Sequence, residues 1–219
     1  MSTIEAVAFD KDGVIFDSER IYQRSLTLAL EQLNLTIDDA VKHSFIGGDL
    51  HTIRRVLQNI LGERMNVATF LKEYWLAERD RIIEEEGLDF IDGVESLIES
   101  LYAQGYPLAL VTNDSLDNLL ADVSRSRRDL LSYFSVVITL DNVVNAKPHP
   151  EPYERASAFL GVAPEQLLVI EDSVTGARAA VAAGARVLLL NEHQTPVPED
   201  LAANVHKIIT HHREVCAQL

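Results

Sequence analysis

Short apolar segments, spaced along the whole chain, are the feature that most constrains the fold. They are rich in Val, Ile and Leu and lack clean polar alternation, as expected for strands covered on both faces. The segments are 4–9, 107–112, 136–139, 167–170 and 186–190. Helical patterns separate the later segments, and strands that alternate with helices predict a parallel sheet with helices on both sides. We therefore expect an α/β fold.

Residues 18–86 differ from the rest of the chain, because every pattern within them is helical. An all-helical insertion after the first strand would lie at the carboxyl edge of the sheet, where open α/β folds bind ligands. Such an insertion would serve as a lid. We expect a core domain formed by residues 1–17 and 88–219, and a helical cap domain formed by residues 18–87.

The charge balance argues against several kinds of partner. The chain has 34 acidic and 19 basic residues and a formal net charge of −15, which repels nucleic acid and anionic lipid. It has no apolar stretch of membrane-spanning length and no signal-peptide pattern at its start. We therefore expect a cytoplasmic monomer that binds neither nucleic acid nor membrane. An anionic substrate would need a locally positive site, which a metal ion can provide.

The last residues offer no catalytic group. A single thiol, Cys216, cannot form an internal disulfide, and a terminal segment is a poor place for a nucleophile. We interpret His206, His211 and His212 as part of a solvated terminus rather than as metal ligands.

Two carboxylates directly follow the first apolar segment. Asp10 and Asp12 are two positions apart, so they lie on the same side of an extended backbone. Gly13 permits the sharp turn that takes the chain toward the insertion. A plain surface turn is the alternative interpretation, because Asp and Gly are common turn residues. The ends of the other predicted strands favour a functional site.

The second strand and a later loop add a hydroxyl, an amide and a cation. Thr112 and Asn113 come at the end of the second strand, and Asp114 or Ser115 then caps a helix. Lys147 precedes a proline, which holds it extended and places a compact cation where a phosphate can bind. Taken singly, Thr112 is an ordinary strand residue and Lys147 an ordinary surface residue.

The fourth strand ends in two adjacent carboxylates, Glu171 and Asp172. Burying both would be costly unless they face a cation. Ligands that are all oxygen favour Mg²⁺ over zinc or copper. Ser173 would cap the alanine-rich helix that follows.

These four clusters, in this order, resemble the haloacid dehalogenase superfamily of phosphohydrolases over nearly the whole chain. The closest branch has a helical cap after the first strand and includes phosphoglycolate-type phosphatases, sugar-phosphate phosphatases and β-phosphoglucomutase. The resemblance implies a Rossmann-like three-layer core with an inserted all-helical cap domain. It also implies a Mg²⁺-dependent phosphatase that hydrolyses a small phosphate monoester, such as a sugar phosphate or phosphoglycolate, through an aspartyl-phosphate intermediate.

The resemblance also implies a role for each site residue. Asp10 would be the nucleophile and Asp12 the general acid and base. Thr112 and Lys147 would bind the phosphate, and we add Asn113 to this group. The metal set would be Asp10, the backbone carbonyl of Asp12, and Asp172, with Glu171 nearby, either bound directly or through water. Lys11 stands where the family usually has an apolar residue.

The sequence of the predicted cap does not identify the substrate, and it does not exclude one alternative activity. We expect Gly47 and Gly48 to form its substrate-facing loop. A phosphomutase of the β-phosphoglucomutase type is the alternative, although Tyr22 replaces that enzyme's histidine and residues 45–50 contain no arginine. Asp49 would repel the second phosphate of a bisphosphate. Arg54 and Arg55 would compensate only if the helix turned them inward.

Other rivals fit less well. A dehalogenase needs neither a second acid nor a metal pair, and phosphonate hydrolysis needs a cap lysine, whereas Lys42 and Lys72 have the pattern of surface residues. A signalling receiver domain has no helical insertion after its first strand. A non-catalytic phosphate-binding module remains the alternative from another class, and it would not explain why every expected catalytic side chain is present.

Overall fold

The computed structural model of the chain describes residues 3–38, 41–42, 45, 50–126, 128–192 and 194–219, with the side chains of residues 50–52 left out. The chain divides into two compact units. One consists of Met1–Phe16 and Asp89–Leu219, and the other of Asp17–Leu88. Among the described residues, none of the helices has the length and apolar character needed to cross a membrane.

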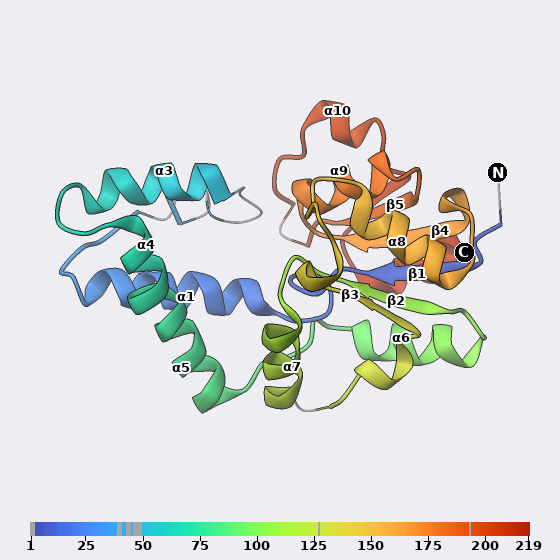
Figure 1. The fold of residues 1–219 in the computed structure, drawn as a ribbon, viewed down its shortest axis with the longest axis horizontal. Helices are drawn as coiled ribbons and strands as arrows, with labels where there is room; N and C mark the ends of the chain where they lie inside the picture. Colours follow the sequence, from blue (N-terminus) through green and yellow to red (C-terminus); the bar gives the residue numbers. More distant parts are fainter. Residues whose placement is uncertain (1–2, 39–40, 43–44, 46–49, 127, 193) are drawn as a thin grey trace. The chain divides into compact units, whose positions relative to one another are not determined.

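A six-stranded parallel sheet forms the centre of the first unit, so the predicted α/β fold is confirmed (Figure 1). The strand order is β3-β2-β1-β4-β5-β6. The strands are β1 (Ala6–Phe9), β2 (Leu108–Val111), β3 (Val136–Ile138), β4 (Leu167–Glu171), β5 (Arg186–Leu190) and β6 (Lys207–Ile209). The chain runs outward from β1 in one direction and from β4 in the other, so the β1–β4 boundary is the topological switch point where such sheets bind ligands.

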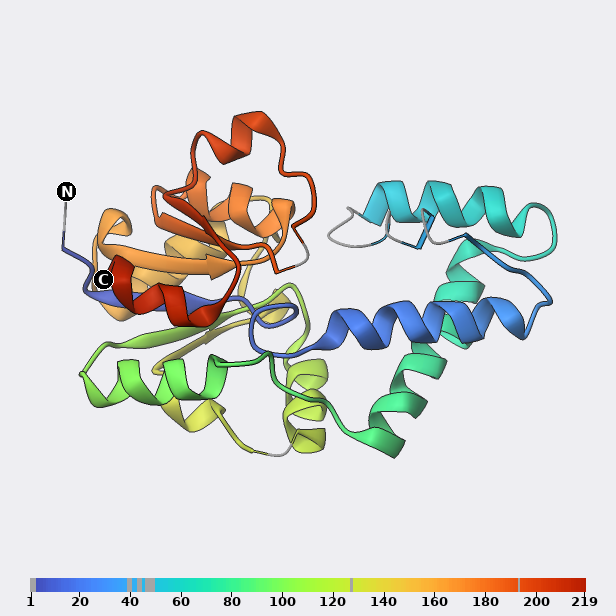
Figure 2. The same ribbon diagram turned by 180° about the vertical axis from the view of Figure 1, so that it is seen from behind.

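Helices cover both faces of this sheet (Figures 1 and 2). They are α6 (Val94–Ala103), α7 (Leu116–Arg125), α8 (Glu151–Leu160), α9 (Val174–Ala182) and α10 (Glu199–Ala202), with a C-terminal 3₁₀-helix η5 (His212–Gln218) and shorter 3₁₀ turns at Leu131–Tyr133, Leu140–Asn142 and Pro164–Gln166. Alternate residues of β1 face opposite layers, as the period of two requires. Ala6 and Ala8 belong to the apolar core shared with α8 and α9, whereas Phe9 packs edge-on against Phe134.

In the described residues of the second unit, the regular elements are helices. It contains α1 (Ser18–Glu31), α3 (Leu50–Leu61), α4 (Val67–Thr69), a π-helical turn η1 (Phe70–Trp75) and α5 (Leu76–Glu86). Its own apolar core includes Leu26, Leu57, Phe70 and Trp75. The Trp75 indole donates to the Tyr22 carbonyl oxygen and to the Ser25 hydroxyl, both at 3.0 Å, which satisfies the polar atom of a buried ring.

The C-terminal segment differs from its expected character. Residues 199–219 form α10, the edge strand β6 and η5 instead of a solvated tail. His212 is completely buried, and its ring nitrogen Nδ1 lies 3.3 Å from the backbone oxygen of Asp92. His211 lies 3.1 Å from the Asp92 carboxylate. The interpretation of a solvated terminus is therefore wrong for His212, whereas His206 is exposed as expected.

Candidate active site

The site centres on one buried ammonium group that joins three strand ends. The Lys147 Nζ donates to Asp10 Oδ1 at 2.6 Å, to Glu171 Oε1 at 2.6 Å and to the Val111 carbonyl oxygen at 2.8 Å. These partners come from the ends of β1, β4 and β2. The structure therefore brings Lys147 and Asp10 together from positions 137 residues apart.

Lys147 is held as a charged group. Its burial alone would lower the pKa of the amine, but the carboxylates of Asp10 and Glu171 outweigh burial and raise the pKa instead. The Tyr153 ring lies 5.0 Å from the ammonium nitrogen and adds a cation–π contact. Lys147 is thus a fixed positive charge inside an acidic protein.

Asp10 is a buried carboxyl group at the end of β1. Its backbone N–H donates to the Ile170 carbonyl oxygen at 3.0 Å, which continues the β1–β4 pairing. Burial, and then repulsion from Glu171, raise the pKa of Asp10 to about 7, although Lys147 acts in the opposite direction. The protein alone therefore leaves the Asp10 carboxylate short of positive charge.

Three carboxylates at this edge could hold a metal ion. One oxygen each from Asp10, Glu171 and Asp172 lies within 4.8 Å of the others. A Cβ atom at Gly13 would overlap the Asp172 carboxylate, so the glycine leaves room for that ligand. A cation would relieve the repulsion that raises the pKa of Asp10, and an all-oxygen donor set suits a hard ion such as Mg²⁺. The residues present therefore fit this metal.

Asp12 does not belong to this group of three carboxylates. Its Oδ2 lies 3.1 Å from the Lys11 Nζ. Its Oδ1 is buried and has no hydrogen-bond partner within the described part of the chain. The loop that carries Asp12 closes tightly, because the Lys11 carbonyl oxygen accepts from the N–H groups of Ile15 at 2.9 Å and Phe16 at 3.0 Å. One carboxyl oxygen of Asp12 is therefore buried without a hydrogen-bond partner among the described residues.

Residues that follow β2 hold the backbone of Lys147 in place. The Asn113 side chain accepts from the Lys147 N–H at 3.0 Å and donates to the Lys147 carbonyl oxygen at 3.2 Å. Thr112 is buried, and its hydroxyl oxygen accepts from the Asp114 N–H at 3.1 Å. The amide of Asn113 thus holds the lysine backbone in this structure, and its predicted contact with phosphate remains a prediction.

Helix caps beside the site follow the sequence expectation in part. The Ser115 hydroxyl accepts from the Asn118 N–H and caps α7, and Ser173 caps α9 through the Gly176 N–H. Asp114 has a different partner, because its carboxylate accepts from Lys11.

Tyr153 is a site residue that the sequence pattern did not reveal. Its hydroxyl donates to Glu171 Oε1 at 2.5 Å, the same oxygen that accepts from Lys147. Burial, and then the Glu171 charge, raise the pKa of Tyr153 well above its usual value, so the phenol stays a donor. An aromatic residue in the first turn of a helix has the signature of a core residue, and nothing in the local sequence marks it otherwise.

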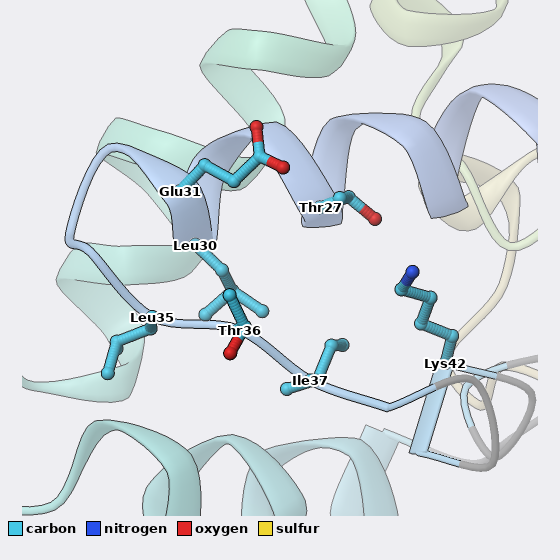
Figure 3. Close-up of a pocket in the computed structure, with 7 residues that line it drawn as sticks. All are labelled: Thr27, Leu30, Glu31, Leu35, Thr36, Ile37 and Lys42. Atoms are coloured by element: carbon cyan, nitrogen blue, oxygen red, sulfur yellow. The ribbon is translucent and has the colours of Figure 1, made fainter.

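The predicted cap loop, Gly47 and Gly48, lies outside the described residues. Its neighbour Phe45 packs edge-on against Trp75 within the helical unit. That unit also has a small pocket of about 90 Å³ (Figure 3). The pocket is lined by Thr27, Leu30, Glu31, Leu35, Thr36, Ile37 and Lys42. None of these is a predicted catalytic residue.

The fold and the site together define a class: a Rossmann-like α/β protein with carboxylates and a lysine at the switch point of its sheet. The chain belongs to the haloacid dehalogenase-like hydrolase family, whose sequence model matches residues 7–190.

Known proteins agree with this assignment. A phosphoglycolate phosphatase from Salmonella paratyphi A is 31% identical over 207 residues, which cover 84% of this chain and 80% of the relative. A Thermotoga maritima protein named as a candidate β-phosphoglucomutase superposes with a TM-score of 0.80 at 27% identity, covering 99% of this chain and 100% of that one. A hydrolase of the same family from Deinococcus radiodurans, solved with bound phosphate and sodium, gives a TM-score of 0.78 at 26% identity, covering 100% and 96%. The predicted enzyme class, a phosphatase-type hydrolase, is confirmed.

Proposed function

We propose that this protein is a Mg²⁺-dependent phosphatase that hydrolyses a small phosphate monoester through covalent attack by Asp10. The observation that carries the proposal is the buried Lys147, which lies within hydrogen-bonding distance of both Asp10 and Glu171. A phosphate and a carboxylate repel each other in water, so a nucleophilic aspartate needs fixed positive charge beside it. The three carboxylate oxygens of Asp10, Glu171 and Asp172, which lie within 4.8 Å of one another, support a second positive charge at this position.

The metal would be held by Asp10, Asp172 and the backbone carbonyl of Asp12. When bound, Mg²⁺ would neutralise and polarise the phosphoryl group. Glu171 is assigned a supporting position, because its Oε1 already accepts from Lys147 and Tyr153. It would orient these two groups beside the ion.

The protein side chains account for the two chemical steps. Asp10 attacks phosphorus in line with the ester oxygen and becomes an aspartyl phosphate, while Lys147 and Thr112 bind the phosphoryl oxygens. Asp12 gives its proton to the departing alcohol, and the resulting carboxylate then takes a proton from the water that hydrolyses the intermediate. General acid–base catalysis of this kind contributes about 10²–10⁴ in rate.

The relatives and the helical unit support a proposal for the substrate class. The 31% identity to a phosphoglycolate phosphatase supports phosphoglycolate or a similarly small phosphate ester. We assign the helical unit, Asp17–Leu88, as the cap that recognises the alcohol part of the substrate, with Gly47 and Gly48 in its substrate-facing loop.

A phosphomutase is the second candidate, favoured by the likeness to the Thermotoga maritima protein. Asp49 and the lack of arginine in residues 45–50 argue against it. Conversion of glucose 1-phosphate to glucose 6-phosphate, primed by the bisphosphate, would identify a mutase. Release of inorganic phosphate from the monoester would identify a phosphatase.

A substrate panel tests the phosphatase proposal. Phosphate release from phosphoglycolate, glucose 6-phosphate, AMP and 4-nitrophenyl phosphate is measured with Mg²⁺ and again with excess chelator. We expect turnover that chelator abolishes and Mg²⁺ restores. Asp10→Asn should lower kcat/KM by more than about 10³-fold, because an amide oxygen is a poor nucleophile.

The matched control is Asp117→Asn, which changes an exposed aspartate of α7 in the same way. This variant should keep wild-type turnover. Near-normal activity of Asp10→Asn, or activity that survives chelation, would contradict the proposal.

A further inference from the structure

Glu151 is a carboxylate outside the metal-binding group, and both of its oxygens accept backbone hydrogen bonds. It lies in the first turn of α8, and its side chain is 13% exposed. Oε1 accepts from the Val144 N–H at 3.0 Å, and Oε2 accepts from the Asn145 N–H at 2.8 Å and from the Asn145 side chain at 3.1 Å. Arg155, four positions further along the helix, donates to Oε1 at 2.9 Å. The Glu151 side chain is therefore fixed between α8 and the loop before it.

These donors keep Glu151 ionised. The N–H groups of Val144 and Asn145 lower the pKa of Glu151 to about 2, and Arg155 acts in the same direction. Hydrogen bonds to an ionised acceptor are shorter and stronger than those between neutral groups. At neutral pH both backbone bonds to Glu151 are therefore charge-assisted.

The loop that Glu151 holds leads directly into the lysine of the site. Lys147 stands two positions after Asn145, in a stretch that has neither helix nor strand. The Ala146 carbonyl oxygen accepts from the His149 N–H at 2.9 Å, and the Glu151 N–H donates to His149 Nδ1 at 3.2 Å. Because no sheet pairing fixes this loop, its position depends on these hydrogen bonds.

Lys147 is thus held from two sides of the chain. Asn113, which follows β2, bonds to both the N–H and the carbonyl oxygen of Lys147, and Glu151 holds the two residues that lead into it. The Lys147 ammonium group lies 2.6–2.8 Å from acceptors at three strand ends, so a shift of the loop would carry the ammonium group away from them. A displacement of about 1 Å at a catalytic site can cost about 10² in rate.

We propose that Glu151 is a positioning residue for Lys147: its carboxylate fixes the two backbone N–H groups before the lysine and so keeps the ammonium group where the phosphoryl oxygens bind. This inference rests on the proposed phosphatase function. Glu151 acts through the loop, and no bond to it forms or breaks during the reaction. The alternative is a purely local role, in which an acid in the first turn stabilises α8 through the helix dipole.

Two variants separate the position of the carboxylate from its charge. Glu151→Gln keeps the length of the side chain, but its amide offers a single oxygen to two backbone N–H groups. Glu151→Asp keeps the charge on a side chain that is one carbon too short to reach both N–H groups. We expect each variant to lower kcat/KM for 4-nitrophenyl phosphate by about 10–100-fold, mainly through kcat. Orthovanadate, which mimics the transferring phosphoryl group, should inhibit each variant more weakly by a similar factor.

The matched controls are Glu154→Gln and Glu154→Asp, which change an exposed acid in the same helical turn. They alter the interaction with the helix dipole in the same way and should keep wild-type kcat/KM. Urea unfolding establishes that each variant is folded under the assay conditions, and if Glu151→Gln is not, Glu151→Asp decides the question. A purely local role would lower stability and leave kcat/KM of the folded protein unchanged.

Normal kcat/KM in a folded Glu151 variant, or equal losses in the Glu154 variants, would overturn the role of Glu151 and leave the phosphatase proposal intact. If the wild-type protein releases no phosphate from any ester of the panel, the phosphatase proposal itself has failed, and the role of Glu151 fails with it.

Discussion

At the residue scale, the charge balance of the site depends on which donor each carboxylate oxygen accepts a hydrogen bond from. Glu171 Oε1 accepts from both Lys147 and Tyr153, and a Cβ atom at Gly176 would overlap the Glu171 carboxylate. Asp10 shares Lys147 with Glu171, and among the described residues no second side chain donates to Asp10. The negative charge of Asp10 is therefore less well compensated than that of Glu171, whose Oε1 already accepts two hydrogen bonds.

Tyr153→Phe tests whether the phenol acts only by donating a hydrogen bond to Glu171, without contacting the reacting atoms. The change removes one hydrogen bond to a charged acceptor, which contributes about 1.5–3 kcal/mol to folding. We expect lower stability by roughly that amount and kcat/KM lower by about 5–50-fold, since Lys147 keeps its other partners. Urea unfolding and steady-state kinetics provide the measurements.

Tyr102→Phe removes the hydroxyl of an exposed tyrosine and should change neither quantity. A loss of more than about 10³-fold in Tyr153→Phe would place Tyr153 on the reacting atoms instead. An unchanged stability would show that its hydrogen bond to Glu171 has no energetic weight.

At the scale of elements, the C-terminal 3₁₀-helix η5 is fixed to the start of α6 through histidines. His212 is buried beneath this contact, and its Nδ1 donates to the Asp92 carbonyl oxygen. Burial lowers the pKa of His212 to about 4, with the His211 charge acting in the same direction and Asp92 opposing it. The folded protein therefore holds a neutral imidazole.

This pKa predicts how stability changes with pH. The unfolded state takes up a proton near pH 6.5 and the folded state only near pH 4, so the stabilisation is complete above pH 6.5 and is lost as pH falls toward 4. The loss amounts to about 3 kcal/mol at pH 4 for a shift of this size. His212→Asn keeps a donor near Nδ1 and should flatten the stability curve between these pH values.

Denaturant unfolding at several pH values measures this effect. His206→Asn changes an exposed histidine and should retain the wild-type slope. If His212→Asn has the same slope as the wild type, the neutral histidine does not control acid stability.

At the scale of the whole molecule, local patterns predicted the fold and several of the side chains that meet at one edge of the sheet. Apolar runs and helix stop signals depend on neighbouring residues, so β1 to β5 and the helical insertion were readable from the sequence. The proximity of Asp10, Lys147 and Asp172 was predictable because parallel strands bring their carboxyl ends to one edge. Their catalytic and metal-binding roles stay predictions.

The features that escaped prediction all depend on distant partners. Lys11 is buried only because carboxylates 103 and 111 positions away surround it, and His212 because η5 packs on α6. Strand β6 has three residues, two of them exposed, and it exists by pairing with β5. Such residues carry no periodic signal, so the local sequence resembles a surface turn or tail.

Direct detection of the acyl phosphate tests the central claim, which is that Asp10 attacks phosphorus. The protein is mixed with the best substrate of the panel and Mg²⁺, quenched in denaturant, and treated with borohydride, which reduces an acyl phosphate to the alcohol. We expect peptide mass spectrometry to find homoserine at position 10 in a substrate-dependent amount, and none in Asp10→Asn. Turnover without modification at Asp10, or reduction at Asp12 or Asp172 instead, would contradict the account.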